Sequence, residues 1–235
     1  MDIMRKIRFV TDQFYHIYNR GVERRDIFMQ ERDYIRFLCA LYLFNDVKIH
    51  DYDLSTINLR GLSSCRGRQE PLVNIVHWAL MPNHFHLLLH QQVDGGISSF
   101  MHKVGTGFSM YVNKKYERSG RLFQGTFKAK FVDQDPYFSH LSIYVPLNPL
   151  GLRWPQWKEE GVPRGQTERA KQYLRTYRWT SFNDYFGQSV IPDLVAKEIF
   201  MEAIGSYKAY ERLADEYLTR GLSLSYKSDL LHYEA

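Results

Sequence analysis

Cysteine is scarce in this 235-residue sequence, and long apolar runs are absent. A membrane-spanning helix needs about 20 mainly apolar residues in a row, so we expect no membrane span and no membrane partner. Cys39 lies in an apolar helical pattern and Cys65 in a loop rich in glycine and serine, which fits reduced thiols better than a disulfide framework. The first residues show no apolar stretch of a secretory signal. Together these features predict a cytoplasmic protein.

Acidic residues are nearly missing from residues 103–130, where seven basic residues accompany a single acid, Glu117. The net charge of the whole chain is +5, so this segment carries all of it. Phenylalanine and tyrosine interleave with the basic residues, which indicates a polyanion-binding face, although a charge cluster is equally typical of a solvated helix face. The basic residues are Lys103, Lys114, Lys115, Arg118, Arg121, Lys128 and Lys130.

The hydrophobic pattern predicts alternating strands and helices in the order β-α-β-β-α-β-α. That order is typical of an α+β fold with a split βαβ (ferredoxin-like or RRM-like) antiparallel sheet and helices on one side. Two further helical stretches follow, at about 192–204 and 207–220. The expected strands are 14–19, 73–80, 84–90 and 127–132, and the expected helices are 31–45, 97–116 and 135–148.

We expect a core at residues 1–153, which includes the helix at 135–148. Residues 154–235 are expected to form a C-terminal helical extension that wraps the core or forms a small appendage. The polar stretch at 51–71 reads as a long loop, to which no function is assigned.

His84 and His86 lie two residues apart in a predicted strand, so both side chains point to the same face and can reach one ion. Neither a cysteine pair nor a further closely spaced histidine pair follows, which argues against a closed structural zinc site. An open site with two imidazoles and one oxygen ligand can polarise a substrate oxygen. Two ordinary histidines remain the alternative interpretation of this pair.

Tyr144 and Asn148 are four residues apart in a predicted helix, so they share one face. A phenol is a poor nucleophile near neutral pH, because its pKa is about 10, unless a nearby cation or base stabilises the phenolate. The chain has 17 tyrosines, and spacing alone does not select Tyr144 among them.

Five motifs in the same order closely resemble those of the REP-associated tyrosine transposases, single-tyrosine members of the HUH single-strand nucleases. The match extends from about Tyr15 to Tyr185. The motifs are Tyr15–Gly21 (YHIYNRG), Met81–Leu89 (MPNHFHLLL), Gly120–Lys128 (GRLFQGTFK), Tyr144–Pro149 (YVPLNP) and Tyr177–Ser181 (YRWTS).

The resemblance implies that His84 and His86 bind a divalent metal, with Asn148 as the third ligand, and that Tyr144 is the catalytic nucleophile. In this family the tyrosine attacks single-stranded DNA at hairpin-forming repeats. A 5′-phosphotyrosine link and a free 3′-OH result, and the 3′-OH can later rejoin strands. The resemblance implies Mg²⁺ or Mn²⁺ as cofactor and no nucleotide cofactor. It implies hairpin or single-stranded DNA as partner, with residues 1–153 as the catalytic core and the extension at 154–235 packing on that core or contacting the DNA. The protein is expected to be a monomer or homodimer.

Basic side chains in and near the motifs are expected to contact DNA phosphates, while aromatic residues stack on unpaired bases or pack in the core. The aromatic candidates are Phe123, Tyr116 and Phe127. The expected phosphate contacts are Arg20, Arg24, Arg118, Arg121, Lys128 and Lys130.

Two residues depart from the family pattern. Ile143 stands where relatives commonly have a basic residue, so any phosphate contact there must come from elsewhere. Pro146 removes a helix hydrogen bond and predicts a kink near Ser142. These departures leave open a protein that binds hairpin DNA with weakened catalysis. A small metallohydrolase is a third possibility, disfavoured by the basic aromatic segment.

Overall fold

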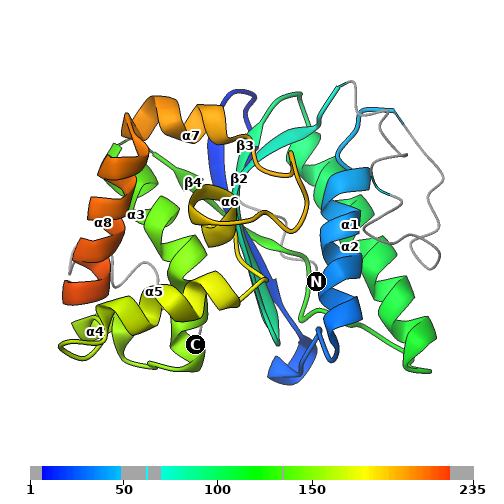
Figure 1. Cartoon of the computed structure of the whole chain (residues 1–235). Helices are drawn as coiled ribbons and strands as arrows, with labels where there is room; N and C mark the ends of the chain where they lie inside the picture. The colour runs from blue at the N-terminus through cyan, green and yellow to red at the C-terminus, as the bar shows by residue number, and fades with distance from the viewer. Residues whose placement is uncertain (1–6, 49–61, 63–69, 134, 223–235) are drawn as a thin grey trace. The chain divides into compact units, whose positions relative to one another are not determined.

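The computed structural model describes residues 7–48, 62, 70–133 and 135–222 (Figure 1). Most of the predicted loop at 51–71, with Cys65, lies outside these residues. The chain divides into two compact units, Met1–Ile75 with Leu80–Val132, and Val76–Ala79 with Asp133–Ala235. The helix of Tyr144 falls in the second unit, whereas the predicted boundary places it in a core ending at residue 153. That boundary stays a prediction, and each unit is described by itself.

The first unit is built on a four-stranded sheet with strand order β2-β3-β1-β4. Strand β1 is antiparallel to both β3 and β4. Short turns explain the local pairing, since Pro82 and Asn83 join β2 to β3 directly. This arrangement confirms the predicted α+β class and the split βαβ order. The strands are β1 (Phe14–Arg20), β2 (Val73–Met81), β3 (His84–Gln91) and β4 (Lys128–Val132).

Helices α1 (Glu31–Leu43) and α2 (Gly96–Lys115) pack against each other, and their apolar faces cover one side of the sheet. Phe37 of α1 lies 5.0 Å, centroid to centroid, from Phe85 of β3 and 5.0 Å from Phe108 of α2. All three rings are buried. Because Phe85 alternates with His84 and His86 along β3, the two histidines point to the opposite face of the sheet. A short 3₁₀ helix, η1 (Val22–Arg24), follows β1.

Asp33 joins the beginning of α1 to the end of α2 through a buried carboxylate. It accepts hydrogen bonds from the Lys115 ammonium (2.6 Å), the Tyr116 hydroxyl (2.7 Å) and the Tyr111 hydroxyl (3.0 Å). The backbone N–H groups of Met29 and Gln30 donate to it as well. Burial alone raises the pKa of Asp33, but the donors, Lys115 first, hold that pKa below its ordinary value.

We expect Asp33→Ala to lower the free energy of unfolding by about 3 kcal/mol, because the donors around Asp33 lose their shared acceptor. Since the Asp33 pKa is depressed in the folded state, its contribution is complete above the ordinary carboxyl pKa. It is lost as the pH falls through the lowered value. Urea denaturation at neutral and acidic pH measures both effects. Asp94→Ala, at an exposed position, serves as control. Equal denaturation midpoints for the two variants would contradict the stabilising role of Asp33.

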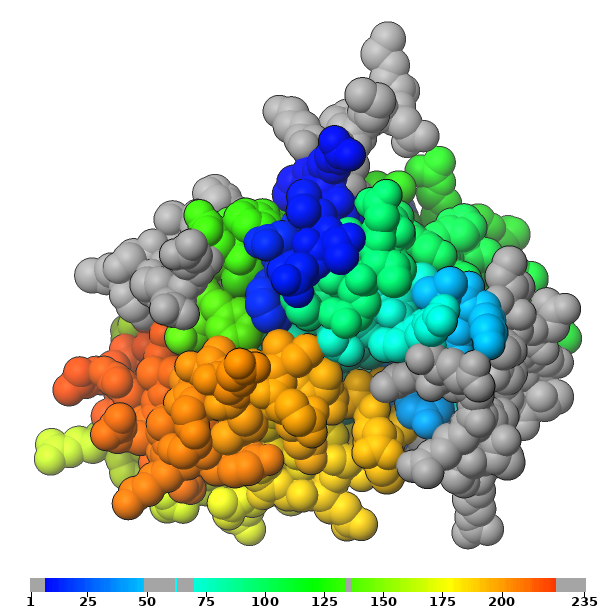
Figure 2. Space-filling model, turned by 90° about the horizontal axis from the view of Figure 1, so that it is seen from above, coloured from blue at the N-terminus to red at the C-terminus, as the bar shows by residue number. Residues whose placement is uncertain are grey.

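The second unit consists mainly of helices. The predicted helices near 192–204 and 207–220 are present, while three helices between residues 157 and 186 were not predicted. Helix α7 packs against α8, as the space-filling view also shows (Figure 2). No described helix combines the length and apolarity needed to cross a membrane. The elements are α3 (Asp135–Leu147), η3 (Asn148–Leu152), α4 (Trp157–Glu160), α5 (Thr167–Thr176), α6 (Phe182–Phe186), α7 (Lys197–Ile204) and α8 (Tyr207–Arg220).

Pro146 lies inside α3, which continues through it to Leu147. Proline cannot donate to the carbonyl four residues earlier, that of Ser142. The buried Tyr210 hydroxyl of α8 donates to this carbonyl instead, at 3.0 Å. The Thr180 hydroxyl in turn donates to the Pro146 carbonyl at 2.8 Å. Tertiary hydrogen bonds therefore satisfy the carbonyl that the proline leaves without a donor, and α3 continues past Pro146, while the kink near Ser142 stays a prediction.

Removing the Tyr210 hydroxyl leaves the Ser142 carbonyl without its hydrogen-bond donor. We expect Tyr210→Phe to lower the free energy of unfolding by about 1–3 kcal/mol, the cost of a buried acceptor left unsatisfied. Tyr207→Phe, half-exposed on the same helix, is the matched control. Circular dichroism during urea denaturation measures the difference, and a Tyr210→Phe midpoint equal to that of the control refutes it.

Candidate active site

The histidine face is the side of the sheet opposite α1 and α2, and it carries His84 and His86. The ring centroids of these histidines are 5.1 Å apart, with their planes nearly perpendicular. His86 is buried and His84 is half-buried. Their spacing along β3 therefore places both imidazoles side by side on one rigid strand, as the sequence predicted.

Asn83 fixes the orientation of the His84 ring. The amide nitrogen of Asn83 donates to the Arg24 carbonyl at 3.2 Å, so its amide oxygen faces His84. That oxygen lies 2.6 Å from His84 Nδ1, which must therefore carry the proton and donate it. The assignment leaves the lone pair of a neutral His84 on Nε2, the atom available for a metal.

His16 of β1 plays the corresponding part for His86. Its Nε2 lies 2.9 Å from Nδ1 of His86, and the two rings are stacked with centroids 5.1 Å apart. Burial, helped by the charge of Lys130, lowers the pKa of His16 to about 3, so His16 is neutral at physiological pH. A neutral His16 with its lone pair on Nε2 accepts a hydrogen bond from Nδ1–H of His86, and in this tautomer the lone pair of His86 is on Nε2, where a ligand can bind.

Three of the predicted phosphate contacts share the histidine face. In the strand register, Arg20 lies opposite His84, Lys130 lies opposite His16, and Tyr18 lies opposite both His86 and Lys128. The Lys128 ammonium sits 6.0 Å from the centroid of the Tyr18 ring. The histidines are therefore flanked by positive side chains on neighbouring strands, an arrangement that attracts a phosphodiester backbone.

The other predicted phosphate contacts lie off the strands of the histidine face. Arg24 is exposed on η1, Arg118 is half-buried just after α2, and Arg121 is exposed in the segment that leads to β4. Two further basic residues of segment 103–130 have structural contacts, because Lys115 binds Asp33 and Lys103 donates to the Asp46 carbonyl at 2.9 Å.

The three aromatic candidates for base stacking also differ in their contacts. Phe123 is 9% exposed and packs edge-on against Phe85, while the Tyr116 hydroxyl binds Asp33. Packing therefore accounts for these two. Phe127 is half-buried, with its ring stacked on Phe9 at a centroid distance of 6.2 Å.

Tyr144 and Asn148 belong to the second unit, on α3 and at the start of η3, and both are buried. The Lys158 ammonium of α4 lies 5.1 Å from the centroid of the Tyr144 ring. Lys158 is itself only 6% exposed, and no sequence pattern singled it out. Its contact with Tyr144 is a cation–π interaction with the face of the ring. Ile143 is fully buried and presents no group to a phosphate.

The donor set fits an open metal site better than a closed one. Within the described ranges, no group of three or more His, Cys, Asp and Glu side chains has the arrangement of a metal site. The two histidines are nevertheless oriented by Nδ1 contacts, with both Nε2 atoms buried. Two imidazole nitrogens suit Mn²⁺ better than Mg²⁺, which prefers oxygen ligands.

Comparisons with known proteins show what part of the chain and its fold are similar to. Residues 67–147, which include both histidines and Tyr144, match the family described as IS200-like transposases. Among solved structures, the chain resembles a REP-associated tyrosine transposase bound to a REP hairpin, with a TM-score of 0.51 and 12% identity. The match covers 82% of this chain and 89% of that one. No curated protein matches the sequence. The resemblance to tyrosine transposases is thus confirmed, with the solved structure bearing on the fold alone.

Proposed function

We propose that the protein is a metal-dependent transposase that nicks and rejoins single-stranded DNA at hairpin-forming repeats. The observation that carries this proposal is the histidine face itself. Two imidazoles are held by Asn83 and His16 with their Nε2 atoms available, beside Arg20, Lys128 and Lys130 on the same face. The family match over residues 67–147 supports the same function.

In the proposed reaction, the Tyr144 phenol oxygen forms a bond to the phosphorus of one phosphodiester. The bond from that phosphorus to the 3′ oxygen breaks, which gives a 5′-phosphotyrosine and a free 3′-OH. The phenol proton passes, directly or through water, to the departing 3′ oxygen, and the positive charge of Lys158 beside the ring favours its loss from the phenol. The free 3′-OH of another strand can reverse the bond change, so strand transfer needs no nucleotide cofactor.

His84 and His86, with Asn148 as oxygen donor, would hold the divalent ion. When bound, the ion neutralises the negative charge that gathers on the phosphate oxygens in the transition state. Arg20, Lys128 and Lys130 bind the flanking phosphates and position the strand across the histidine face.

His16 serves as a positioning residue in this proposal. We expect His16→Ala to weaken Mn²⁺ binding about ten- to a hundredfold, the usual effect of losing the partner that orients a ligating histidine. Isothermal titration calorimetry measures the affinity. His16→Gln keeps a hydrogen-bonding group beside His86 and is expected to recover part of the loss. An unchanged Mn²⁺ affinity in His16→Ala would contradict the positioning role of His16.

The test uses a fluorescent DNA pool in which a fixed hairpin is flanked by randomised single-stranded arms. With Mn²⁺, the wild-type protein is expected to yield a covalent protein–DNA band that survives denaturing electrophoresis and disappears when a chelator is present. Absence of the band with Mn²⁺ and Mg²⁺ contradicts the proposed reaction. Hairpin binding without any band would favour the alternative, a hairpin-DNA-binding protein with weakened catalysis.

A further inference from the structure

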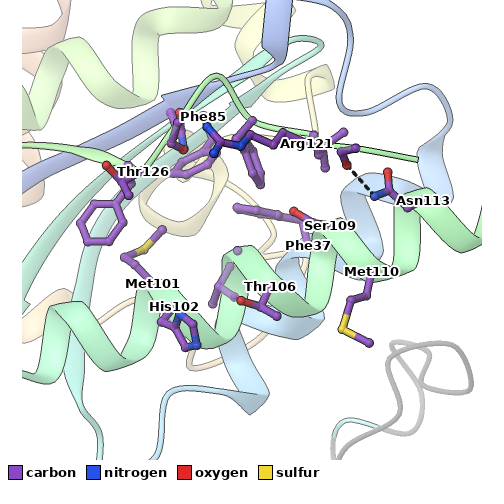
Figure 3. A pocket seen from close by; sticks show the side chains of 18 of the residues that line it. Phe37, Phe85, Met101, His102, Thr106, Ser109, Met110, Asn113, Arg121 and Thr126 are labelled. Carbon is purple, nitrogen blue, oxygen red and sulfur yellow. Dashed lines mark hydrogen bonds between the residues drawn. The ribbon is translucent and has the colours of Figure 1, made fainter. Parts of the chain in front are cut away.

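A cavity of about 720 Å³ lies on the helix-covered side of the first unit, between α2 and residues 120–127 (Figure 3). Its base is apolar and is formed by Phe37, Phe85, Met101 and Phe123. Phe37 is fully buried and Phe85 and Met101 are nearly so, while Phe123 is 9% exposed and offers most of the apolar surface that a ligand could contact. A volume of this size is within the range of pockets that bind small organic ligands.

The rim of the cavity is polar and carries no acidic group. Asn19, Ser109 and Asn113 contribute amide and hydroxyl groups, and Arg121 supplies a positive charge. In Figure 3 the Arg121 and Asn113 side chains lie along the same edge. Apolar walls with hydrogen-bonding edges and one cation fit a flat heteroaromatic ring attached to a phosphate.

Hydrogen bonds fix the wall opposite α2. The Asn113 amide donates to the Gly120 carbonyl at 2.9 Å, and the Asn19 amide donates to the Gly125 carbonyl at 3.1 Å. Between them, the Gln124 N–H donates to the Arg20 carbonyl at 2.9 Å. The wall is thus tied to both α2 and β1, so the cavity is formed before any ligand arrives.

Glycines keep the cavity open. A Cβ atom added at Gly105 of α2 or at Gly125 would meet no protein atom within 4 Å. Neither position has a positive φ, so the backbone conformation itself does not require glycine. Alanine is the better helix former at Gly105. These glycines therefore leave space rather than relieve a clash.

The end of β1 links the cavity to the histidine face. Asn19 lines the cavity, while the next residue, Arg20, lies opposite His84 on the other face. Phe85 of the cavity base likewise lies between His84 and His86. The cavity and the histidine face therefore lie on opposite sides of the sheet at the same end of β1.

We infer that this cavity binds one unpaired nucleobase of the DNA strand, stacked on the apolar base, with the adjoining phosphate at Arg121. The inference rests on the proposed function and names a subsite of the same DNA. Charge favours DNA over an amphipathic peptide as occupant, because the lining of the cavity holds Arg121 and no carboxylate.

The test compares the affinity for a labelled mixed-sequence single-stranded oligonucleotide with that for an abasic oligonucleotide of equal length, by fluorescence anisotropy. Gly105→Trp fills the cavity. Ser99→Trp, exposed on the same helix and outside the cavity, is the matched control. If Gly105→Trp is unstable, Thr106→Trp at an exposed cavity position replaces it.

Wild type and Ser99→Trp are expected to prefer the base-bearing strand at least tenfold, while Gly105→Trp loses most of this preference and binds the abasic strand as before. A preference of wild-type size in Gly105→Trp, or none in the wild type, overturns the inference. The covalent band is scored separately. Its absence in the wild type refutes the proposed reaction, whereas a normal band with an unaltered base preference in Gly105→Trp refutes only the base site.

Discussion

Tyr144→Phe is expected to form no covalent DNA adduct while binding hairpin DNA with wild-type affinity. The substitution removes only the phenol oxygen and keeps the buried ring against Lys158. Loss of the attacking atom leaves nothing to accept the phosphoryl group, so the rate of adduct formation falls by at least about a thousandfold. Denaturing electrophoresis over a time course measures this rate.

Tyr137→Phe is the matched control, because Tyr137 lies on the same helix and is also largely buried. It is expected to form the adduct as the wild type does. An adduct in Tyr144→Phe at an undiminished rate assigns the nucleophile to another residue. Loss of the adduct in both variants points instead to damage to α3.

His86→Ala is expected to abolish measurable Mn²⁺ binding and to slow adduct formation by more than about a hundredfold. That loss exceeds the ten- to hundredfold typical of an outer-shell partner such as His16, because His86 itself donates to the ion. Calorimetry and the adduct assay report the two effects independently, and hairpin binding without metal tests whether the sheet remains intact.

His90→Ala provides the control on the same strand. His90 points to the same face as His86 but lies four residues along β3, where it contacts Asp12 at 3.0 Å. This variant is expected to keep both metal affinity and adduct formation. Equal losses in His86→Ala and His90→Ala would attribute the effect to the strand rather than to a metal ligand.

The sequence predicted the sheet well because strand alternation and turn residues are local signals. The pair of histidines two residues apart, with apolar neighbours between and after them, already implies a strand with imidazoles on one face. The residues that orient these two imidazole rings were harder to predict from the sequence. Asn83 is adjacent to His84, but His16 meets His86 only through the β1–β3 register, which no local pattern reports.

Long-range contacts also explain what the sequence could not show about Pro146 and the basic segment. A proline in a helix leaves one carbonyl without its donor, and the donor that replaces it here, Tyr210, lies 64 residues further along the chain. The sequence predicted that the basic residues of segment 103–130 form one surface, but in the structure they lie in different places. Lys128 and Lys130 join the histidine face, Lys115 binds Asp33, and Arg121 borders the cavity.

Mass-spectrometric mapping of the covalent adduct tests the central claim most directly. After nuclease and trypsin digestion, the proposed reaction predicts a nucleotide attached through phosphate to the peptide of residues 131–153, with fragment ions that locate it on Tyr144 rather than Tyr137. A nucleotide on any other residue, or a protein that releases cleaved DNA without ever carrying it, would contradict the account.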